Sequence, residues 1–192
     1  MIIDIGGGTT DIAVISLGGI VRSKNIKIAG DRFNNDIMSY IRNEFKILIG
    51  EKTAEYIKVT VGAVVPGESL ETTIRGRDLI TGLPREVVIT DSDIREAMSS
   101  SIDTLVESTK EVLETTPPEI LADVMHRGIH LVGGGALIKG LDGLLTSIIK
   151  IPVYIAEDPL TAIARGTGII LENLEKYSSV LIQNEDELRT QK

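Results

Sequence analysis

The stretch Asp4-Ile5-Gly6-Gly7-Gly8-Thr9-Thr10-Asp11 decides the fold. Three consecutive glycines let the backbone approach an anion closely and direct several N–H groups towards it. In Rossmann and Walker loops a helix follows the glycines, whereas here Ile12-Ala13-Val14-Ile15 continues as a strand. The stretch therefore predicts a hairpin that cradles phosphate, with Thr9 and Thr10 donating hydroxyl groups. A plain hairpin turn, with Asp4 satisfied by the protein itself, is the simpler alternative.

Asp4 stands at the end of the strand that leads into the glycines. A carboxylate in that position would lie beside bound phosphate. Mg²⁺ keeps several of its waters when it binds a protein. The position therefore predicts that Asp4 holds a magnesium ion through water.

A second glycine turn, Gly133-Gly134-Gly135, follows the apolar segment 129–132 and precedes a helix predicted over 141–149. Glycine backbone carries no side chain, so a flat ligand can lie directly on it. Taken alone, glycine after a strand is more often only a turn. Open α/β sheets bind ligands at one edge, where strand ends meet. We therefore expect the two glycine turns to converge on one ligand.

Glu55 and Lys58 lie three residues apart in a helix predicted to begin near Glu51, so they share one helical face. A surface ion pair of this spacing contributes only a few tenths of a kcal/mol. That is the simpler interpretation of the pair. Only together with the two glycine turns do Glu55 and Lys58 become candidate ligand contacts.

The rest of the chain predicts an α/β fold in which a small α+β subdomain interrupts a larger one. Apolar and β-branched runs predict three opening strands, and apolar residues at helical spacing predict a helix from Gly30 that stops at Gly50. Within 59–90, β-branched residues are interrupted by glycine and proline, and this pattern predicts a small antiparallel sheet. A long helix is predicted to begin at Thr90. We expect the last helix, 159–177, to pack on the sheet and the tail, 178–192, to fray. The expected units are 1–30 with 90–177, the insertion 31–89, and the tail.

Composition excludes several classes of protein. With 20 Lys and Arg against 28 Asp and Glu, the net charge is −8, which disfavours binding to nucleic acid. The chain has no cysteine, so disulfides, thiolate zinc sites and thiol nucleophiles are excluded, and a reducing, cytoplasmic compartment is expected. No apolar run approaches the roughly 20 residues of a membrane span.

Several segments resemble the bacterial actin family of MreB and its paralogue Mbl, within the actin, sugar-kinase and heat-shock ATPase superfamily. The match runs from Met1 to about Tyr177. The segments that carry it are, in order, 4–10, 28–31, 49–55, 75–79, Thr81-Gly82-Leu83-Pro84-Arg85, Thr116-Pro117-Pro118-Glu119 and 156–160.

The resemblance implies an actin-like, ribonuclease-H-like ATPase domain, with subdomain IIA split around an inserted subdomain IIB at 31–89. It also implies roles for individual residues in binding ATP and Mg²⁺. Those expected to face the β- and γ-phosphates are Gly6, Gly7, Gly8 and Thr9. Thr9 would also orient the attacking water, and Asp4 would lie near magnesium. Glu55 and Lys58 would contact ribose and adenine, and the base would rest on Gly133, Gly134, Gly135 and Ala136.

The family's first phosphate loop and its water-positioning acid have no counterpart in this sequence. We therefore interpret the chain as the carboxy-terminal half of a longer protein, inactive alone but part of a slow, filament-coupled ATPase. The resemblance implies a cytoplasmic protein that assembles with itself into filaments at the membrane surface and controls cell shape with elongation proteins. A non-polymerising kinase or a chaperone-type ATPase of the same superfamily is the alternative.

Overall fold

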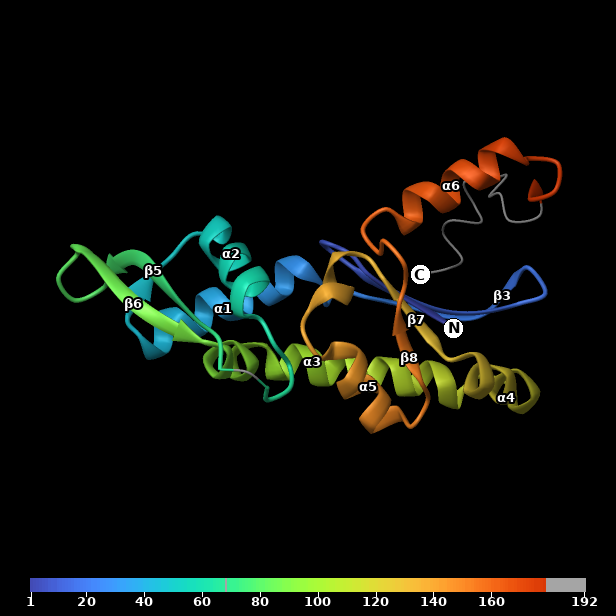
Figure 1. Cartoon of the computed structure of the whole chain (residues 1–192), viewed down its shortest axis with the longest axis horizontal. Helices are drawn as coiled ribbons and strands as arrows, with labels where there is room; N and C mark the ends of the chain where they lie inside the picture. Colours follow the sequence, from blue (N-terminus) through green and yellow to red (C-terminus); the bar gives the residue numbers. More distant parts are fainter. Residues whose placement is uncertain (68, 179–192) are drawn as a thin grey trace.

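The larger part of the protein is a five-stranded sheet. The computed structural model describes residues 1–67 and 69–178. Strands β1 (Ile2–Ile5), β2 (Thr10–Ser16) and β3 (Gly19–Ile26) form an antiparallel meander, and β7 (Ile129–Val132) and β8 (Val153–Ile155) extend it in parallel. The order β3-β2-β1-β7-β8 places β1 and β7 side by side (Figure 1). Each of these two strands ends in a glycine turn, so both turns leave the same edge of the sheet.

In the sequence, the meander is followed by two helices and three strands, and these strands form a smaller sheet. These elements comprise α1 (Gly30–Glu44), β4 (Ile47–Leu48), α2 (Glu51–Val61), β5 (Glu71–Asp78) and β6 (Pro84–Thr90), with antiparallel order β4-β5-β6. The predicted helix end at Gly50 is wrong. The chain leaves the helix after Glu44 because Lys46 adopts a left-handed conformation, with φ of 56°, and then enters β4.

Helix α3 (Asp91–Glu114) runs alongside both sheets and joins the two parts (Figure 1). Near its start, Glu96 accepts a hydrogen bond of 3.0 Å from the Tyr40 hydroxyl of α1. Near its end, Glu111 accepts one of 2.5 Å from Lys24 of β3. One continuous helix therefore fixes the position of the smaller sheet relative to the larger.

The start of α3 is the helix start predicted at Thr90. The Thr90 side chain accepts from the Asp93 N–H, and the Asp93 side chain accepts from the Thr90 N–H, which is a capping box. Thr90→Ala is expected to lower the free energy of unfolding by about 1 kcal/mol, measured by chemical denaturation. Ser92→Ala, an exposed change in the same turn, is the control. Equal stability of the two variants would contradict a role for the box.

In the larger part, the core lies between one face of the sheet and the helices α3 and α5 (Leu141–Ile149) (Figure 1), and it continues into the smaller part through α1 and α2. Alternate strand residues point into it, as the period of two in a strand requires. They include Ile3, Ile5, Ile12, Val14, Ile129, Leu131 and Val153. Helix α4 (Pro118–Arg127) begins at its proline and ends before Gly128, as the sequence predicts.

The last helix differs from its prediction. Helix α6 (Ala162–Glu172) is shorter than expected and none of its residues is buried. Ile163 and Leu171, expected to pack on the sheet, are more than half exposed, and α6 stands away from the sheet on the side opposite α3 (Figure 1). The spacing of apolar residues shows that a helix has an apolar face, but it does not show which surface packs against that face. The predicted tail lies outside the described residues from residue 179 onwards.

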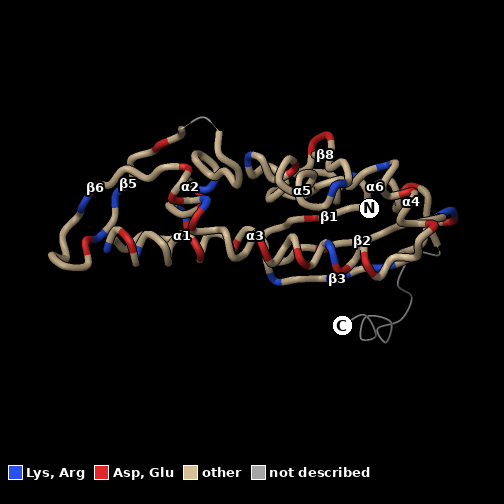
Figure 2. Tube along the Cα trace, turned by 90° about the horizontal axis from the view of Figure 1, so that it is seen from below, with Lys and Arg blue, Asp and Glu red and all other residues tan. Residues whose placement is uncertain are grey.

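Charged side chains are dispersed along the molecule. Along the Cα trace, positions of Lys and Arg are interspersed with positions of Asp and Glu over both parts of the molecule (Figure 2). Within the described residues, no helix combines the length and the apolar character that crossing a membrane requires.

Candidate functional site

The two glycine turns meet at one cavity of about 540 Å³, so the predicted convergence is confirmed. The first turn contributes Gly6 and Gly7, and the second contributes Gly134 and Gly135. Helices α1 and α2 close the remaining side. The other lining residues are Gly30, Asp31, Phe33, Glu55, Lys58, Val59, Leu137, Ile138 and Leu160.

The first turn has free N–H groups. Gly7, Gly8 and Thr9 are exposed, and among the described residues no hydrogen bond engages their backbone N–H groups. The start of α1 holds the turn in place, because Gly30 N donates to Gly6 O at 3.1 Å and Asp31 N donates to Gly7 O at 2.8 Å. With its carbonyls turned towards α1 and its N–H groups unpaired, the turn is suited to bind an anion.

Of the two threonines after the glycines, only Thr9 is exposed. The Thr10 side chain is fully buried, and its hydroxyl donates to Ile28 O at 2.5 Å. The prediction that Thr10 donates to a ligand is therefore wrong, because its hydroxyl ties β2 to the segment after β3. Gly8 and Thr9 lie in the turn but do not line the cavity.

Two carboxylates face each other beside the turn. Asp4 of β1 is paired with Asp11 of β2 in the strand register. Burial, and to a lesser extent the charge of Asp11, raise the pKa of Asp4 above its ordinary value. A cation nearby would relieve this repulsion. The pair offers carboxylate oxygens, which are the ligands that Mg²⁺ prefers. No group of three or more metal-ligating side chains occurs in the parts of the chain described.

Glu55 and Lys58 form a hydrogen-bonded pair on the α2 side of the cavity. Lys58 Nζ donates to Glu55 Oε2 at 2.7 Å and to Gly30 O at 3.1 Å, and only 9% of the Lys58 side chain is exposed. Burial alone would raise the pKa of Glu55, but hydrogen bonds from Lys58 and Asn34 and the charge of Lys58 outweigh it and lower the pKa. Glu55 is therefore ionised near neutral pH, and Lys58 links it to the start of α1.

The second turn packs tightly against β1. Gly133 has φ of 80°, and a Cβ there would lie 2.4 Å from Ile5 O; a Cβ on Gly135 would lie 2.2 Å from Ile5 Cγ2. Ala136 is fully buried. Gly133 and Ala136 do not line the cavity, whereas Gly134 and Gly135 do. The apolar lining from Phe33, Leu137, Ile138 and Leu160 was not predicted from the sequence. The sequence feature that could have indicated this lining is the apolar pair Leu137-Ile138, which follows the second turn and Ala136.

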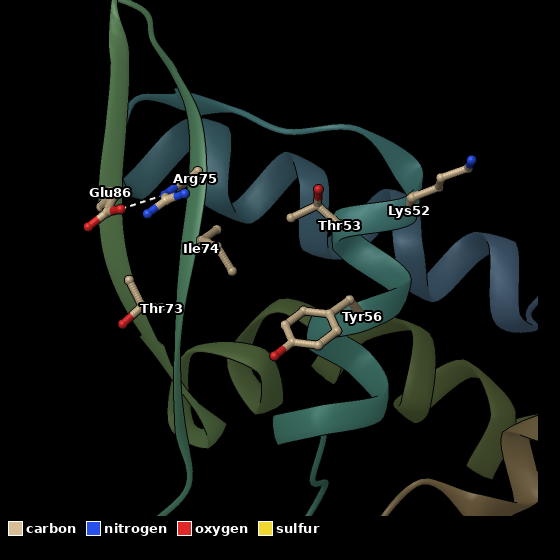
Figure 3. A pocket seen from close by; sticks show the side chains of 7 residues that line it. All are labelled: Lys52, Thr53, Tyr56, Thr73, Ile74, Arg75 and Glu86. Atoms are coloured by element: carbon tan, nitrogen blue, oxygen red, sulfur yellow. Dashed lines mark hydrogen bonds and ion pairs between the residues drawn. The ribbon is translucent and has the colours of Figure 1, made fainter.

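A second hollow, of about 650 Å³, lies between α2 and β5 (Figure 3). Lys52, Thr53 and Tyr56 line it from α2, while Arg75 of β5 is paired with Glu86 of β6 at 2.5 Å. Neither glycine turn reaches this hollow. Its arginine already has a carboxylate partner in Glu86, and the cavity between the glycine turns remains the candidate site.

Comparison with known proteins agrees with this geometry. The family model described as MreB/Mbl protein matches residues 1–179. The cell shape-determining protein Mbl of Bacillus subtilis is 51% identical over 177 residues, which cover 92% of this chain and 53% of Mbl. The cell shape-determining protein MreB of Escherichia coli is 45% identical over 186 residues, covering 96% of this chain and 54% of MreB.

A solved structure resembles the fold described above. The crystal structure of MreB5 of Spiroplasma citri bound to ADP matches with a TM-score of 0.89 at 43% identity, over 93% of this chain and 54% of MreB5. The observed architecture is therefore the mixed α/β fold of the actin-like MreB proteins. The chain spans about half the length of the relatives it matches.

Proposed function

Because this chain belongs to the MreB/Mbl family of cell shape-determining proteins, we propose that its glycine-lined cavity binds ATP together with Mg²⁺. One observation carries the proposal: two glycine turns and the Glu55–Lys58 pair converge on a single cavity. The ADP bound to MreB5 supports the choice of an adenine nucleotide.

Each residue takes the role that the family resemblance implies. The N–H groups of the first turn, with the Thr9 hydroxyl, would bind the phosphates, and Asp4 would hold magnesium through water. Glu55 and Lys58 contact the ribose and base. The second turn, with the buried Ala136 behind it, forms the floor under the base.

Hydrolysis needs groups on both sides of the phosphates, because charge must be stabilised while an attacking water is aligned. This chain supplies one side of the cavity. We expect Thr9 to help orient the water in a longer protein whose other half closes over the nucleotide. That protein would hydrolyse ATP slowly, coupled to filament assembly.

Calorimetric titration of the chain with ADP or ATP and Mg²⁺ tests the site, and phosphate release tests turnover. Saturable but weak binding is expected, with no phosphate release above background. Efficient hydrolysis by residues 1–192 would contradict the one-sided site. Absence of binding would remove the nucleotide assignment altogether.

Self-association is supported by two exposed apolar surfaces at opposite ends of the long axis (Figure 1). At one end, the β5–β6 turn exposes Leu79, Ile80 and Leu83. At the other, the fully exposed Leu17 borders a hollow of about 310 Å³ between the β2–β3 turn and α4. We propose that these two surfaces form a heterologous contact, which produces a filament when the rotation between copies does not close into a ring.

Charged substitutions at the two ends test this arrangement by sedimentation velocity. Ile80→Asp and Leu17→Asp are each expected to weaken self-association of the chain about tenfold or more, because each buries a charge in an apolar contact. Each variant retains one intact end, so their equimolar mixture should stop at a dimer. Ile148→Asp, an exposed change on α5, is the control. A mixture that remains monomeric would contradict the head-to-tail contact.

In the whole protein, we expect the filaments to lie in the cytoplasm on the membrane surface and to act with cell-shape and elongation proteins. The cell shape-determining role of the family supports this expectation. Sedimentation of the full-length protein with lipid vesicles is the direct measurement. Filaments that pellet without carrying lipid into the pellet would contradict attachment.

A further inference from the structure

One buried side chain beneath the cavity has a hydrogen-bonding atom without a partner. Asn34 of α1 is 3% exposed. Its Nδ2 donates to Glu55 Oε2 at 2.9 Å, whereas its Oδ1 has no partner among the described residues. A buried polar atom left unsatisfied costs about 1–3 kcal/mol, so a physical reason for it is required.

The Glu55 carboxylate determines which way the Asn34 amide lies. An ionised carboxylate can only accept hydrogen bonds, so the NH₂ group of Asn34 must face it. The amide oxygen then points to the side where no donor is present. The unsatisfied oxygen is thus the consequence of donating to Glu55.

The same carboxylate oxygen also binds Lys58. Glu55 Oε2 accepts from both Asn34 and Lys58, while Oε1 has no hydrogen bond within the described part of the chain. Lys58 also donates to Gly30 O, and Gly30 N donates to Gly6 O in the first glycine turn. A continuous series of hydrogen bonds therefore runs from Asn34 through Glu55, Lys58 and Gly30 to the turn.

We propose that Asn34 is a positioning residue of the nucleotide site, which fixes the Glu55 carboxylate by one oxygen and leaves the other available to the ligand. Through Lys58 and Gly30 it also holds α2 in register with the phosphate-cradling turn. The inference rests on the proposed function, that the cavity binds a nucleotide. Asn34 itself does not line the cavity, so its effect is exerted through Glu55.

Replacing Asn34 by leucine removes the donor and keeps the branched shape of the side chain. Asn34→Leu is expected to raise the pKa of Glu55, followed by ¹³C NMR during a pH titration of the free protein, because the carboxylate loses a hydrogen bond. Calorimetry with ADP and Mg²⁺ should show about fivefold to tenfold weaker binding. Stability to denaturant should be equal or higher, since the unsatisfied oxygen is removed as well.

Two further variants make the test decisive. Asn34→Ala, which introduces no new bulk, should raise the pKa of Glu55 in the same way, even if the leucine variant folds poorly. Asn35→Leu makes the same change at the next, exposed position of α1 and should leave both the pKa and the affinity unchanged.

The outcomes separate this inference from the function on which it rests. If the unaltered chain binds no ADP, the proposed function fails, and the positioning role fails with it. If the unaltered chain binds ADP and the Asn34 variants bind equally well with an unchanged Glu55 pKa, the inference alone is wrong. A loss of stability with no change in the Glu55 pKa would show that Asn34 has only a structural role.

Discussion

Gly133→Ala is expected to lower the free energy of unfolding by about 3 kcal/mol or more. The backbone at Gly133 has φ of 80°, a conformation that residues with a Cβ rarely adopt. The new Cβ would also lie 2.4 Å from the Ile5 carbonyl oxygen and 2.5 Å from Asp4 Oδ1. Strand β1 cannot move away, because it is paired with β2 on one side and β7 on the other. Chemical denaturation measures the loss.

The neighbouring glycine provides a matched control within the same turn. Gly134 is exposed, and a Cβ there would meet only Leu160 Cδ2, at an ordinary 3.5 Å. Gly134→Ala should therefore change the free energy of unfolding by no more than about 0.5 kcal/mol. Equal destabilisation by both substitutions would contradict the close packing of the second turn on β1.

Lys58→Met is expected to weaken nucleotide binding by about tenfold to a hundredfold, which corresponds to the loss of one charged hydrogen-bonding group. The substitution keeps the long apolar stem but removes the ammonium group that donates to Glu55 and to Gly30 O. Glu55 then loses its charged partner beside the cavity. Calorimetric titration with ADP and Mg²⁺ measures the change.

Lys52 is the matched control on the same helix. Its side chain is exposed, lines the hollow between α2 and β5 (Figure 3), and forms no ion pair in the described portion of the chain. Lys52→Met should leave the affinity within a factor of about two. If both lysine variants lost affinity equally, the effect would come from overall charge and not from a site at Lys58.

Much of the fold follows from local signals in the sequence. Glycine turns, the Thr90 cap and the proline that starts α4 predicted the strand–helix order, because each acts within a few residues. The errors occurred where residues far apart in the sequence determine the structure. The strand β4 pairs with β5 about thirty residues later, and nothing in the spacing of Ile163 and Leu171 shows which surface covers α6.

The site was predicted less completely than the fold. Patterns within a few residues of sequence, such as the glycine triplets and the Glu55–Lys58 spacing, identified residues that the structure brings together. Two facts required coordinates: the Thr10 hydroxyl is used internally, and Asn34 lies beneath Glu55. Both depend on contacts between segments about twenty residues apart, which sequence periodicity does not specify.

The most direct test is an NMR titration of the ¹⁵N-labelled chain with ATP and Mg²⁺. Backbone amide signals of the two glycine turns, Gly30 and Glu55 should shift together with one saturating dissociation constant. Signals of Lys52, Tyr56 and Arg75, in the hollow between α2 and β5, should remain unchanged. Shifts confined to that second hollow, or no shifts at millimolar ATP, would contradict the account.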